Sequence, residues 1–520
     1  MNRTTLSLCA AVTALAAATG LAALTAPDSG GAAAAATRTS ARLPVERTSL
    51  LCPAPSTSDV AETAYTSFTP AGAAADTDGR STAALEPSVS TLKDATQGAA
   101  QPTGKKTGAA KGAKQPATGK AGKPVVALKE PGKPVAAKES GSDSPALVGT
   151  ATGRLAPGWT TQQTTTVPAG SGRGVLGISC TAPDTDFWFP GASLAKDRQD
   201  YVHLTNPDDT AAVADIELYG KDGALKSQLT DGIPVPAGGS VPVLLPTLTA
   251  DKAEDVTVHV TTRTGRVGAV VRGAGDTTGS DWLAASADPS STLVLPGIPK
   301  DATSVRLVAF APGDDDADLK LRLATSSGTI TPAGAEGLRV KSGMTASLDL
   351  KDVTKGEPGS LLLSPSGNGK ATPVVAALQI TRGKGDKQEI AFLPATAPVT
   401  GRATAADNRA KGSLLSLTAP TATAKVKVTA SAGTEAGGQT VQTYTVKAGT
   451  TLAVTPPVPS GLKGAYALTI EPQSGGPVHA ARTLMLPQGG IEMFTIQTLP
   501  DDRGTVQVPG AEQDLSVLGG

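Results

Sequence analysis

Aromatic residues are scarce in this chain: Phe, Trp and Tyr together make up 3% of its 520 residues. The length leaves room for about three or four domains of roughly 100 to 150 residues each, so large cores can form. Those cores must be aliphatic. Gly, Pro, Ala, Thr and Val are abundant, which is typical of many short β-strands joined by turns and not of helices with heptad repeats.

An excess of charge of either sign is also absent, because 46 Lys and Arg residues balance 46 Asp and Glu residues. Such a chain has no overall field that would attract nucleic acid. We therefore expect no DNA or RNA partner.

Histidine is rare, and the usual catalytic and metal-binding motifs are missing. The three histidines, His203, His259 and His479, alternate with apolar neighbours in separate parts of the chain, so we expect them on outward strand faces that do not meet. The sequence has no HExxH, Cys-x-x-Cys or G-x-S-x-G motif and no phosphate-binding loop. It therefore predicts a protein that is not an enzyme and has no cofactor.

Only three cysteines are present, and Cys9 lies in an apolar N-terminal segment. That leaves Cys52 and Cys180 as the one pair of the remaining chain. Thiols of an exported protein meet an oxidising compartment, which favours pairing. We predict a disulfide between Cys52 and Cys180, and the alternative is two separate buried thiols.

Residues 1–36 carry the pattern of a secretory signal peptide. Arg3 gives the segment a basic start, an apolar run follows at 6–24, and residues 34–36 offer an Ala-x-Ala cleavage pattern. We expect an exported protein that is secreted or associated with the cell envelope. The alternative is an uncleaved N-terminal anchor, which would then be the chain's contact with the membrane.

The stretch between Cys52 and Cys180 divides into two parts. Residues 45–70 are predicted to form one or more strands of the first module. Residues 71–150 have few large apolar side chains to offset their conformational entropy, so we predict a disordered insert rich in Lys, Pro and Ala. We interpret it as a solvated spacer, with a polybasic tether for anionic polymers or lipid headgroups as the alternative. Its lysines include Lys105, Lys106, Lys111, Lys114, Lys120, Lys123, Lys129, Lys133 and Lys138.

A threefold repeat follows the insert. An alternating strand that ends in a proline turn occurs at 201–207, 305–312 and 414–420. A V-x-[AS]-G turn follows in each repeat, beginning at Val235, Val340 and Val446. The period is about 105 residues, which is the size of an immunoglobulin-like sandwich and too long for one propeller blade.

Alternation within the repeats indicates strands with one buried face. We expect Val256, Val258 and Val260 to point inward, with Thr257 and Thr261 outward. The predicted fold is therefore all-β. It consists of three tandem immunoglobulin-like β-sandwich modules in a semi-rigid row, followed by a C-terminal hairpin and tail. The predicted boundaries are 151–290, 291–389 and 390–490 for the modules and 491–520 for the hairpin and tail.

Aromatic and acidic residues around the first repeat are the candidate sites. Trp188, Phe189 and Trp282 are candidate glycan contacts, because exposed aromatic rings stack on sugars, and core packing is the alternative. Asp184 and Asp186 would lie about 7 Å apart along one strand, whereas a glycosidase pair flanks the scissile bond. We interpret these two aspartates as turn caps.

Two acidic turns are weak candidates for calcium. They occupy the same turn between strands in the first and second repeats, and carboxylate-rich loops at the ends of sandwiches can hold calcium. The third repeat has Thr-Ala-Thr at this position, and aspartate is an ordinary turn residue, so we assign no metal site. The candidates are Asp208, Asp209, Asp314, Asp315, Asp316 and Asp318.

Three stretches carry a resemblance to a known family: CTAPDTDFWFPGAS from residue 180, YVHLTNPDDTAAVADIELYGKDG from residue 201 and RVGAVVRG from residue 266. They resemble the actinobacterial exported proteins catalogued as domain of unknown function 5719. The resemblance implies a protein of the envelope of high-GC Gram-positive bacteria, often encoded beside a large glycosyltransferase. It assigns no catalytic residues.

Together these features predict an exported, non-enzymatic protein of the cell envelope that serves as a scaffold or binding module. The alternative is a glycan-binding accessory to the synthesis or display of envelope polysaccharide. The expected partners are a cell-wall or envelope polysaccharide or an envelope protein. Exposure of Trp188 and Trp282 in a groove would favour glycan binding, and burial of both would favour a scaffold.

Overall fold

The computed structural model describes residues 41–72, 81–90, 123–170, 172–229, 231–367 and 371–508. The predicted signal segment, and with it the choice between signal and anchor, lies outside the described residues. Contacts divide the chain into two units, Pro44–Val506 and a smaller one made of Met1–Leu43 and Gln507–Gly520. No helix of the described part is long and apolar enough to cross a bilayer.

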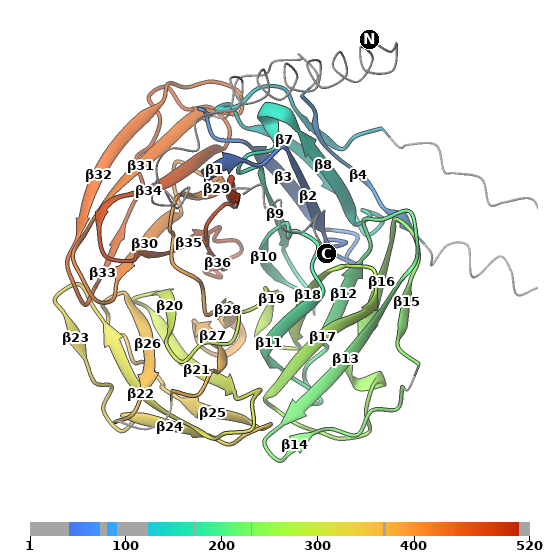
Figure 1. Cartoon of the computed structure of the whole chain (residues 1–520), viewed down its shortest axis with the longest axis vertical. Helices are drawn as coiled ribbons and strands as arrows, with labels where there is room; N and C mark the ends of the chain where they lie inside the picture. The colour runs from blue at the N-terminus through green and yellow to red at the C-terminus, as the bar shows by residue number, and fades with distance from the viewer. Residues whose placement is uncertain are drawn as a thin grey trace, which may run out of the picture. The chain divides into compact units, whose positions relative to one another are not determined.

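The unit Pro44–Val506 contains four β-sandwich modules, where the sequence predicted three. Their strands can be followed by label and colour in Figure 1. Module 1 contains β2 (Arg47–Cys52), β3 (Glu62–Phe68), β4 (Ala83–Pro87), β6 (Val126–Leu128), β7 (Val135–Ser140), β8 (Leu147–Thr152), the 3-10 turn η1 (Gly153–Leu155), β9 (Thr160–Val167) and β10 (Gly174–Ser179). The short β5 (Val89–Ser90) between β4 and β6 pairs in parallel with β16 of module 2. Module 2 contains β11 (Asp186–Ala192), β12 (Tyr201–Thr205), β13 (Ala212–Gly220), β14 (Gly223–Ala224), β15 (Ile233–Val235), β16 (Gly239–Leu244), η2 (Leu245–Thr247), β17 (Val256–Thr264), β18 (Gly268–Gly275) and β19 (Gly279–Leu283).

Modules 3 and 4 complete the unit. Module 3 contains β20 (Leu293–Ile298), β21 (Ala302–Phe310), β22 (Ala317–Ala324), β23 (Thr329–Ile330), β24 (Gly337–Val340), β25 (Thr345–Asp349), β26 (Gly359–Pro365), β27 (Val375–Arg382), η3 (Gly385–Lys387) and β28 (Glu389–Pro394). Module 4 contains β29 (Ala403–Asn408), β30 (Ser413–Ala419), β31 (Ala424–Gly433), β32 (Thr440–Val446), β33 (Thr450–Val454), β34 (Tyr466–Gly475), β35 (His479–Met485) and β36 (Phe494–Thr498).

All four modules share one strand order. Module 4 gives the simplest version, with sheets β29-β34-β31-β32 and β33-β30-β35-β36. Counting strands along the chain, the first, sixth, third and fourth form one sheet, and the fifth, second, seventh and eighth form the other. In the immunoglobulin fold the first strand lies beside the second, whereas here those two strands lie in opposite sheets. The prediction of β-sandwiches is therefore confirmed, but their strand order is not that of immunoglobulins.

Alternating aliphatic side chains form a core between the two sheets of each module. In module 2, Val256, Val258 and Val260 are all buried, as the alternation predicted. In module 4, Leu415 and Leu417 from one sheet pack in the same cluster as Val426 from the other. Thr257, which was expected to point outward into solvent, is buried because its hydroxyl meets that of Thr345 in module 3.

The last strand of each module is the edge strand through which the modules meet. Strands β10, β19, β28 and β36 contact one another in cyclic order, and β36 closes the cycle on β10. Unpaired strand edges favour aggregation unless they are covered, and here the four edges cover one another. The modules therefore form a closed cycle of contacts and not the predicted row.

The predicted disordered insert at 71–150 is partly wrong. Strands β4, β6 and β7 lie within it, as does most of β8, and they complete the two sheets of module 1. These strands are short and contain several alanines, so they have few large apolar side chains, yet Val126 and Leu128 are buried in the module core. Residues 91–122, with Lys105 to Lys120, lie outside the described residues.

The predicted module boundaries shift as a result. The predicted first sandwich, 151–290, joins β9 and β10 of module 1 to the whole of module 2. The predicted C-terminal hairpin is also wrong. Strand β36 pairs with β35 and completes module 4, while β37 (Thr505–Val508) pairs with β1 (Ala41–Pro44) in a separate two-stranded sheet.

Candidate functional site: a cavity where the four modules meet

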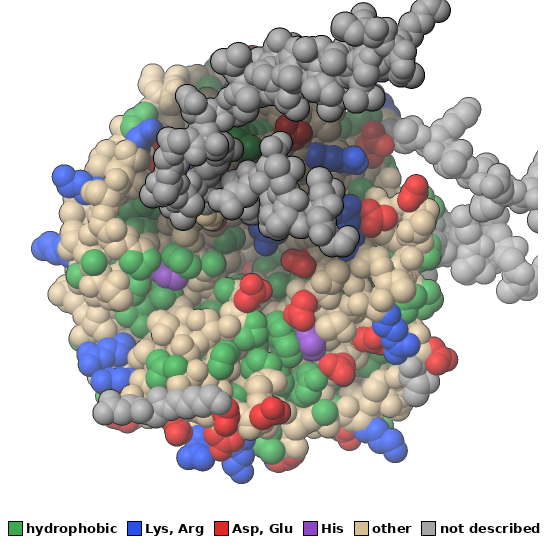
Figure 2. All heavy atoms as spheres, in the orientation of Figure 1, with side chains coloured by type: hydrophobic (Ala, Val, Ile, Leu, Met, Phe, Trp, Pro, Cys, Tyr) green, Lys and Arg blue, Asp and Glu red, His purple; other side chains and the backbone are tan. Residues whose placement is uncertain are grey.

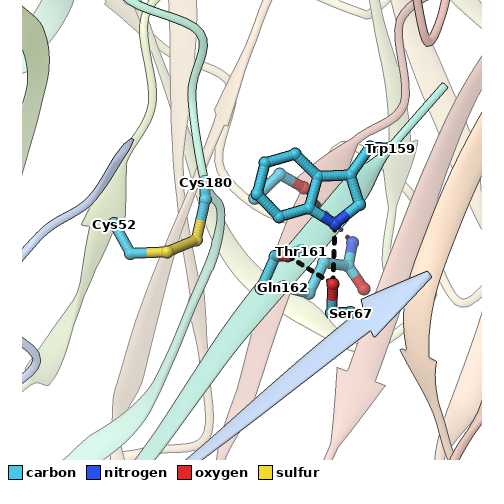
Figure 3. The surroundings of a disulfide bond; sticks show 7 residues. Cys52, Ser67, Trp159, Thr161, Gln162 and Cys180 are labelled. Carbon is cyan, nitrogen blue, oxygen red and sulfur yellow. Dashed lines mark hydrogen bonds between the residues drawn. A yellow bond between two sulfur atoms is a disulfide. The ribbon is translucent and has the colours of Figure 1, made fainter. Parts of the chain in front are cut away.

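The predicted disulfide is present between Cys52, at the end of β2, and Cys180, directly after β10. It joins the two sheets of module 1 across a sequence separation of 128 residues. Beside it, the indole Nε1 of Trp159 donates a hydrogen bond to Ser67 Oγ at 2.8 Å, and Thr161 Oγ1 donates to the same oxygen at 3.0 Å (Figure 3). These bonds fix Trp159 in the module core.

A cavity of about 370 Å³ lies where the four modules meet. Much of its wall comes from equivalent places in the four modules, namely the residues that directly follow β10, β19, β28 and β36. Because those four strands contact one another, the chain segments that leave their ends converge. These segments lie at 180–184, 284–288, 395–397 and 499–503.

The deeper lining of the cavity is apolar. Trp159, Trp282 and Phe392 come from three different modules, and each is at most 2% exposed. Ile178 from module 1 and Ile496 from module 4 add aliphatic surface. Small-molecule sites are usually concave, largely apolar and supplied with a few polar groups, and this lining fits that description.

Aspartates supply the charge of the cavity. Asp184, Asp186 and Asp288 are exposed. Burial disfavours the charged form of Asp501, but hydrogen bonds from Thr400 and the backbone outweigh it and lower its pKa. Figure 2 shows acidic side chains lying among hydrophobic ones on the face viewed there.

Asp502, which also lines the cavity, differs from the other carboxylates. Burial raises its pKa, although Arg402 lies against it with Nε 2.5 Å from Oδ2. The Asp502 carboxylate also accepts a hydrogen bond from Thr404 Oγ1, so this carboxylate is held inside the protein. Its charge is therefore balanced by the protein itself.

Two buried hydrogen-bond donors line the cavity without a partner. Gln497 is 5% exposed, and its Oε1 accepts a bond from Arg482, but its Nε2 has no partner among the described residues. The indole Nε1 of Trp282, a residue that is 1% exposed, is unpartnered in the same part of the chain. A buried donor without an acceptor costs free energy, and both nitrogen atoms are themselves buried, so neither is open to a ligand in the cavity.

Asp281 lies where the last strands of the four modules meet. It is fully buried, and its Oδ1 accepts from the backbone N–H of Gly177 in module 1 and from Thr495 Oγ1 in module 4, both at 3.1 Å. Backbone N–H groups of Trp282 and of Phe392 in module 3 also hydrogen-bond to it. Burial raises its pKa well above the usual range. The residue thus has a structural role in joining the modules.

The candidate glycan contacts are all packed. Phe189 is fully buried, and Trp282 is 1% exposed. Trp188 is half-buried and already stacks on His259, with ring centroids 3.6 Å apart, and on Phe310 of module 3 at 5.3 Å. None of these rings presents a free platform to a sugar.

Two of the three histidines lie where the sequence did not predict. His203 and His479 are buried, and burial lowers their pKa to about 3 and about 4. Each histidine lies on the outer face of its own module. That face packs against a neighbouring part of the chain and is therefore buried. His259 is partly exposed, with its ring nitrogens 3.3 Å from carboxylate oxygens of Asp186 and Glu217.

The two acidic residues weighed as a catalytic pair have separate contacts. Asp186 faces His259, whereas Asp184 Oδ1 accepts the backbone N–H of Thr185 at 2.8 Å. Two of the calcium candidates are likewise engaged elsewhere, since Asp208 pairs with Arg266 and Asp316 with Arg339. Across the described ranges, no cluster of three or more His, Cys, Asp or Glu side chains could hold a metal ion.

Fold and cavity together define a class of protein: an all-β protein of four sandwich modules arranged in a closed cycle of contacts around a shared cavity. The chain belongs to the Family of unknown function (DUF5719), whose model matches residues 135–457. That match begins at β7 of module 1 and ends after β33 of module 4. No curated protein and no solved structure matches the chain.

Sequence reasoning found the disulfide but missed the cavity. Asp288, Gln497 and Asp501 stand in three different segments, and no local motif links them. The one signal that could have located the site is positional, because each of these residues lies in or directly after a strand that ends a module.

Proposed function

We propose that the protein is exported and acts in the cell envelope as a non-catalytic binding scaffold, with the cavity between the modules as its binding site. Export is supported by the signal-like pattern at 1–36 and by the Cys52–Cys180 disulfide, because disulfides persist in oxidising compartments.

The observation that carries the binding role is the construction of the cavity. All four modules contribute to its wall, and the strands that lead into it are locked together by contacts of buried residues. A site held this way is preformed, which limits the entropy cost of binding. Two neighbouring carboxylates of the cavity, Asp501 and Asp502, are already engaged with Thr400 and Arg402.

Glycan binding is less well supported. Its candidate residues Trp188, Phe189 and Trp282 are packed in cores or against neighbouring rings. An accessory role in polysaccharide display would therefore need another surface.

Export is tested by fractionating cells that produce the protein and titrating free thiols after denaturation without reductant. We expect the protein outside the cytoplasm, with Cys52 and Cys180 unreactive until a reductant is added. A cytoplasmic protein with two reactive thiols at these positions would contradict export.

Binding is tested by passing envelope extracts over immobilised protein and over two variants. Ala397→Trp places a large side chain at an exposed position of the cavity wall. Ala448→Trp makes the same change at an exposed position that is not part of that wall. We expect Ala397→Trp, but not Ala448→Trp, to lose the envelope components that the wild-type protein retains. Equal retention by all three proteins would overturn the assignment of the cavity as the binding site.

A further inference from the structure

We infer that the ligand of the cavity is a basic segment of polypeptide, with cationic side chains beside apolar ones. This inference rests on the proposed binding role and adds the chemistry of the partner. Five aspartates line the cavity against one arginine. They are Asp184, Asp186, Asp288, Asp501 and Asp502, with Arg503.

The carboxylates of the cavity differ from those on the outside of the modules. On the outside, Asp208, Asp215 and Asp316 each pair with an arginine at 2.7 to 3.0 Å. Among the described residues, neither Asp184 nor Asp288 has a cationic partner. These three outer aspartates are neutralised, as Asp502 is by Arg402, whereas Asp184 and Asp288 leave a local negative potential at the cavity.

The uncompensated charges come from separate segments. Asp184 and Asp288 lie before and after module 2, and Asp501 follows module 4. Asp501 is held by Thr400 and by the backbone N–H of Gly401, with no cation among these partners. Carboxylates distributed over several segments favour a ligand with more than one positive charge.

The apolar part of the wall favours a ligand that is more than a polycation. The half-buried Ala182, Ala284 and Ala285 offer a surface that gains free energy by burying apolar groups. A peptide meets both requirements, because its side chains supply apolar surface as well as positive charge.

Size is consistent with a short peptide segment. A volume of about 370 Å³ is at the lower end of the usual range for binding pockets. We therefore expect a few residues to enter the cavity, with the cationic groups at the carboxylates and apolar side chains against the half-buried alanines of the wall.

The experiment uses the full chain carrying Trp188→Phe. Of the three tryptophans, Trp159 and Trp282 line the cavity and Trp188 does not. Intrinsic fluorescence of this variant therefore reports on the cavity. The probes are three capped pentapeptides, Leu-Lys-Leu-Lys-Leu and its Gln and Glu counterparts, together with spermine as a cation without a peptide backbone.

We expect the lysine peptide to shift the fluorescence and to bind roughly tenfold or more tightly than the glutamine peptide, which corresponds to about 1.4 kcal/mol. The glutamate peptide should not bind. Added salt should weaken the lysine peptide, because the attraction between exposed charges is screened.

A matched pair of charge variants locates the effect. Asp184→Asn combined with Asp288→Asn should weaken the lysine peptide several-fold. Asp209→Asn combined with Asp314→Asn removes the same charge from exposed positions outside the cavity and should leave binding unchanged.

Each contrary result has its own meaning. Equal binding of the lysine and glutamine peptides would overturn the inferred charge preference while leaving a binding role in place. Spermine binding as tightly as the lysine peptide would overturn the assignment to polypeptide. If no probe changes the fluorescence or gives heat in calorimetry, the basic-peptide ligand is wrong, whereas retention of another envelope component by the cavity would still support the proposed function.

Discussion

The interface that closes module 4 onto module 1 differs in kind from the interface between modules 2 and 3. At the closing interface, the buried Asp407 accepts hydrogen bonds from Thr66 at 3.1 Å and Thr164 at 2.7 Å. Its backbone N–H donates to Gln162 Oε1 at 2.9 Å. Apolar contact there is confined to a small cluster around Phe68.

Between modules 2 and 3, aromatic and apolar packing accompanies polar contacts such as the ion pair of Arg306 with Asp255. Phe310 of module 3 lies 5.3 Å from Trp188 and 4.6 Å from Tyr219 of module 2, measured between ring centroids. Phe392 and Ile390 of module 3 pack directly into the core of module 2.

The difference follows the order of the chain. Modules 2 and 3 are consecutive, so a short connection already brings them together, and burial of apolar surface suffices to hold them. Modules 1 and 4 lie far apart in sequence, so contacts between their surfaces have to bring them together. Hydrogen bonds are directional, so a network centred on Asp407 selects one register for this closure.

The largest effect is expected at the apolar interface. Phe310→Ala removes a side chain that is 1% exposed and leaves a cavity between modules 2 and 3. We expect the free energy of unfolding to fall by about 3 to 5 kcal/mol, measured by urea denaturation. Ile330→Ala, at an exposed position, should cost far less, and equal losses would show that Phe310 does not join the modules.

A smaller effect is expected at the polar interface. Thr164→Val keeps the shape of the side chain and removes one hydrogen bond to the carboxylate of Asp407. The expected loss is about 1.5 to 3 kcal/mol in the same assay. The exposed Thr443→Val is the matched control, with a change within about 0.5 kcal/mol. A neutral Thr164→Val variant would contradict the role given to the hydrogen bonds.

The smallest effect depends on pH and concerns a contact between modules 1 and 3, where Arg173 Nε lies 2.7 Å from Glu389 Oε1. Burial raises the pKa of Glu389 to about 7, although Arg173 opposes the shift. The folded state therefore holds this proton more tightly than the unfolded state does. Its contribution to stability is present below about pH 4.5 and is lost as the pH rises towards 7.

We expect Glu389→Gln to remove this loss. The free energy of unfolding of the variant should therefore rise relative to that of the wild type by roughly 1 to 3 kcal/mol between pH 5 and pH 8. The measurement is the free energy of unfolding of both proteins at the two pH values. The buried His203 and His479 are common to both proteins, so their opposite pH dependence cancels. A constant difference between the two proteins would contradict the raised pKa.

Modules 2, 3 and 4 were predictable from sequence because their strands alternate apolar and polar residues, as Val256 to Val260 illustrates. Module 1 was not, because its strand β9 reads TTQQTTTV. Gln162, Gln163 and Thr165 are nevertheless buried there, and Gln162 accepts a hydrogen bond from the backbone of Asp407 in module 4. Alternation of hydrophobicity cannot detect a strand that is buried on polar side chains.

The pairing of Cys52 with Cys180 was predictable because only one pair was available. The cavity was not predictable, since it depends on which module edges meet. That arrangement is decided by contacts between strands as distant in sequence as β10 and β36.

Closure of module 4 onto module 1 also sets the number of repeats. An open array of sandwiches can lengthen by duplication, since each added copy needs only one neighbour. Here a fifth copy would separate β36 from β10 and leave Asp407 without Thr66 and Thr164. Adding a module by gene duplication would therefore require new closing contacts in place of these.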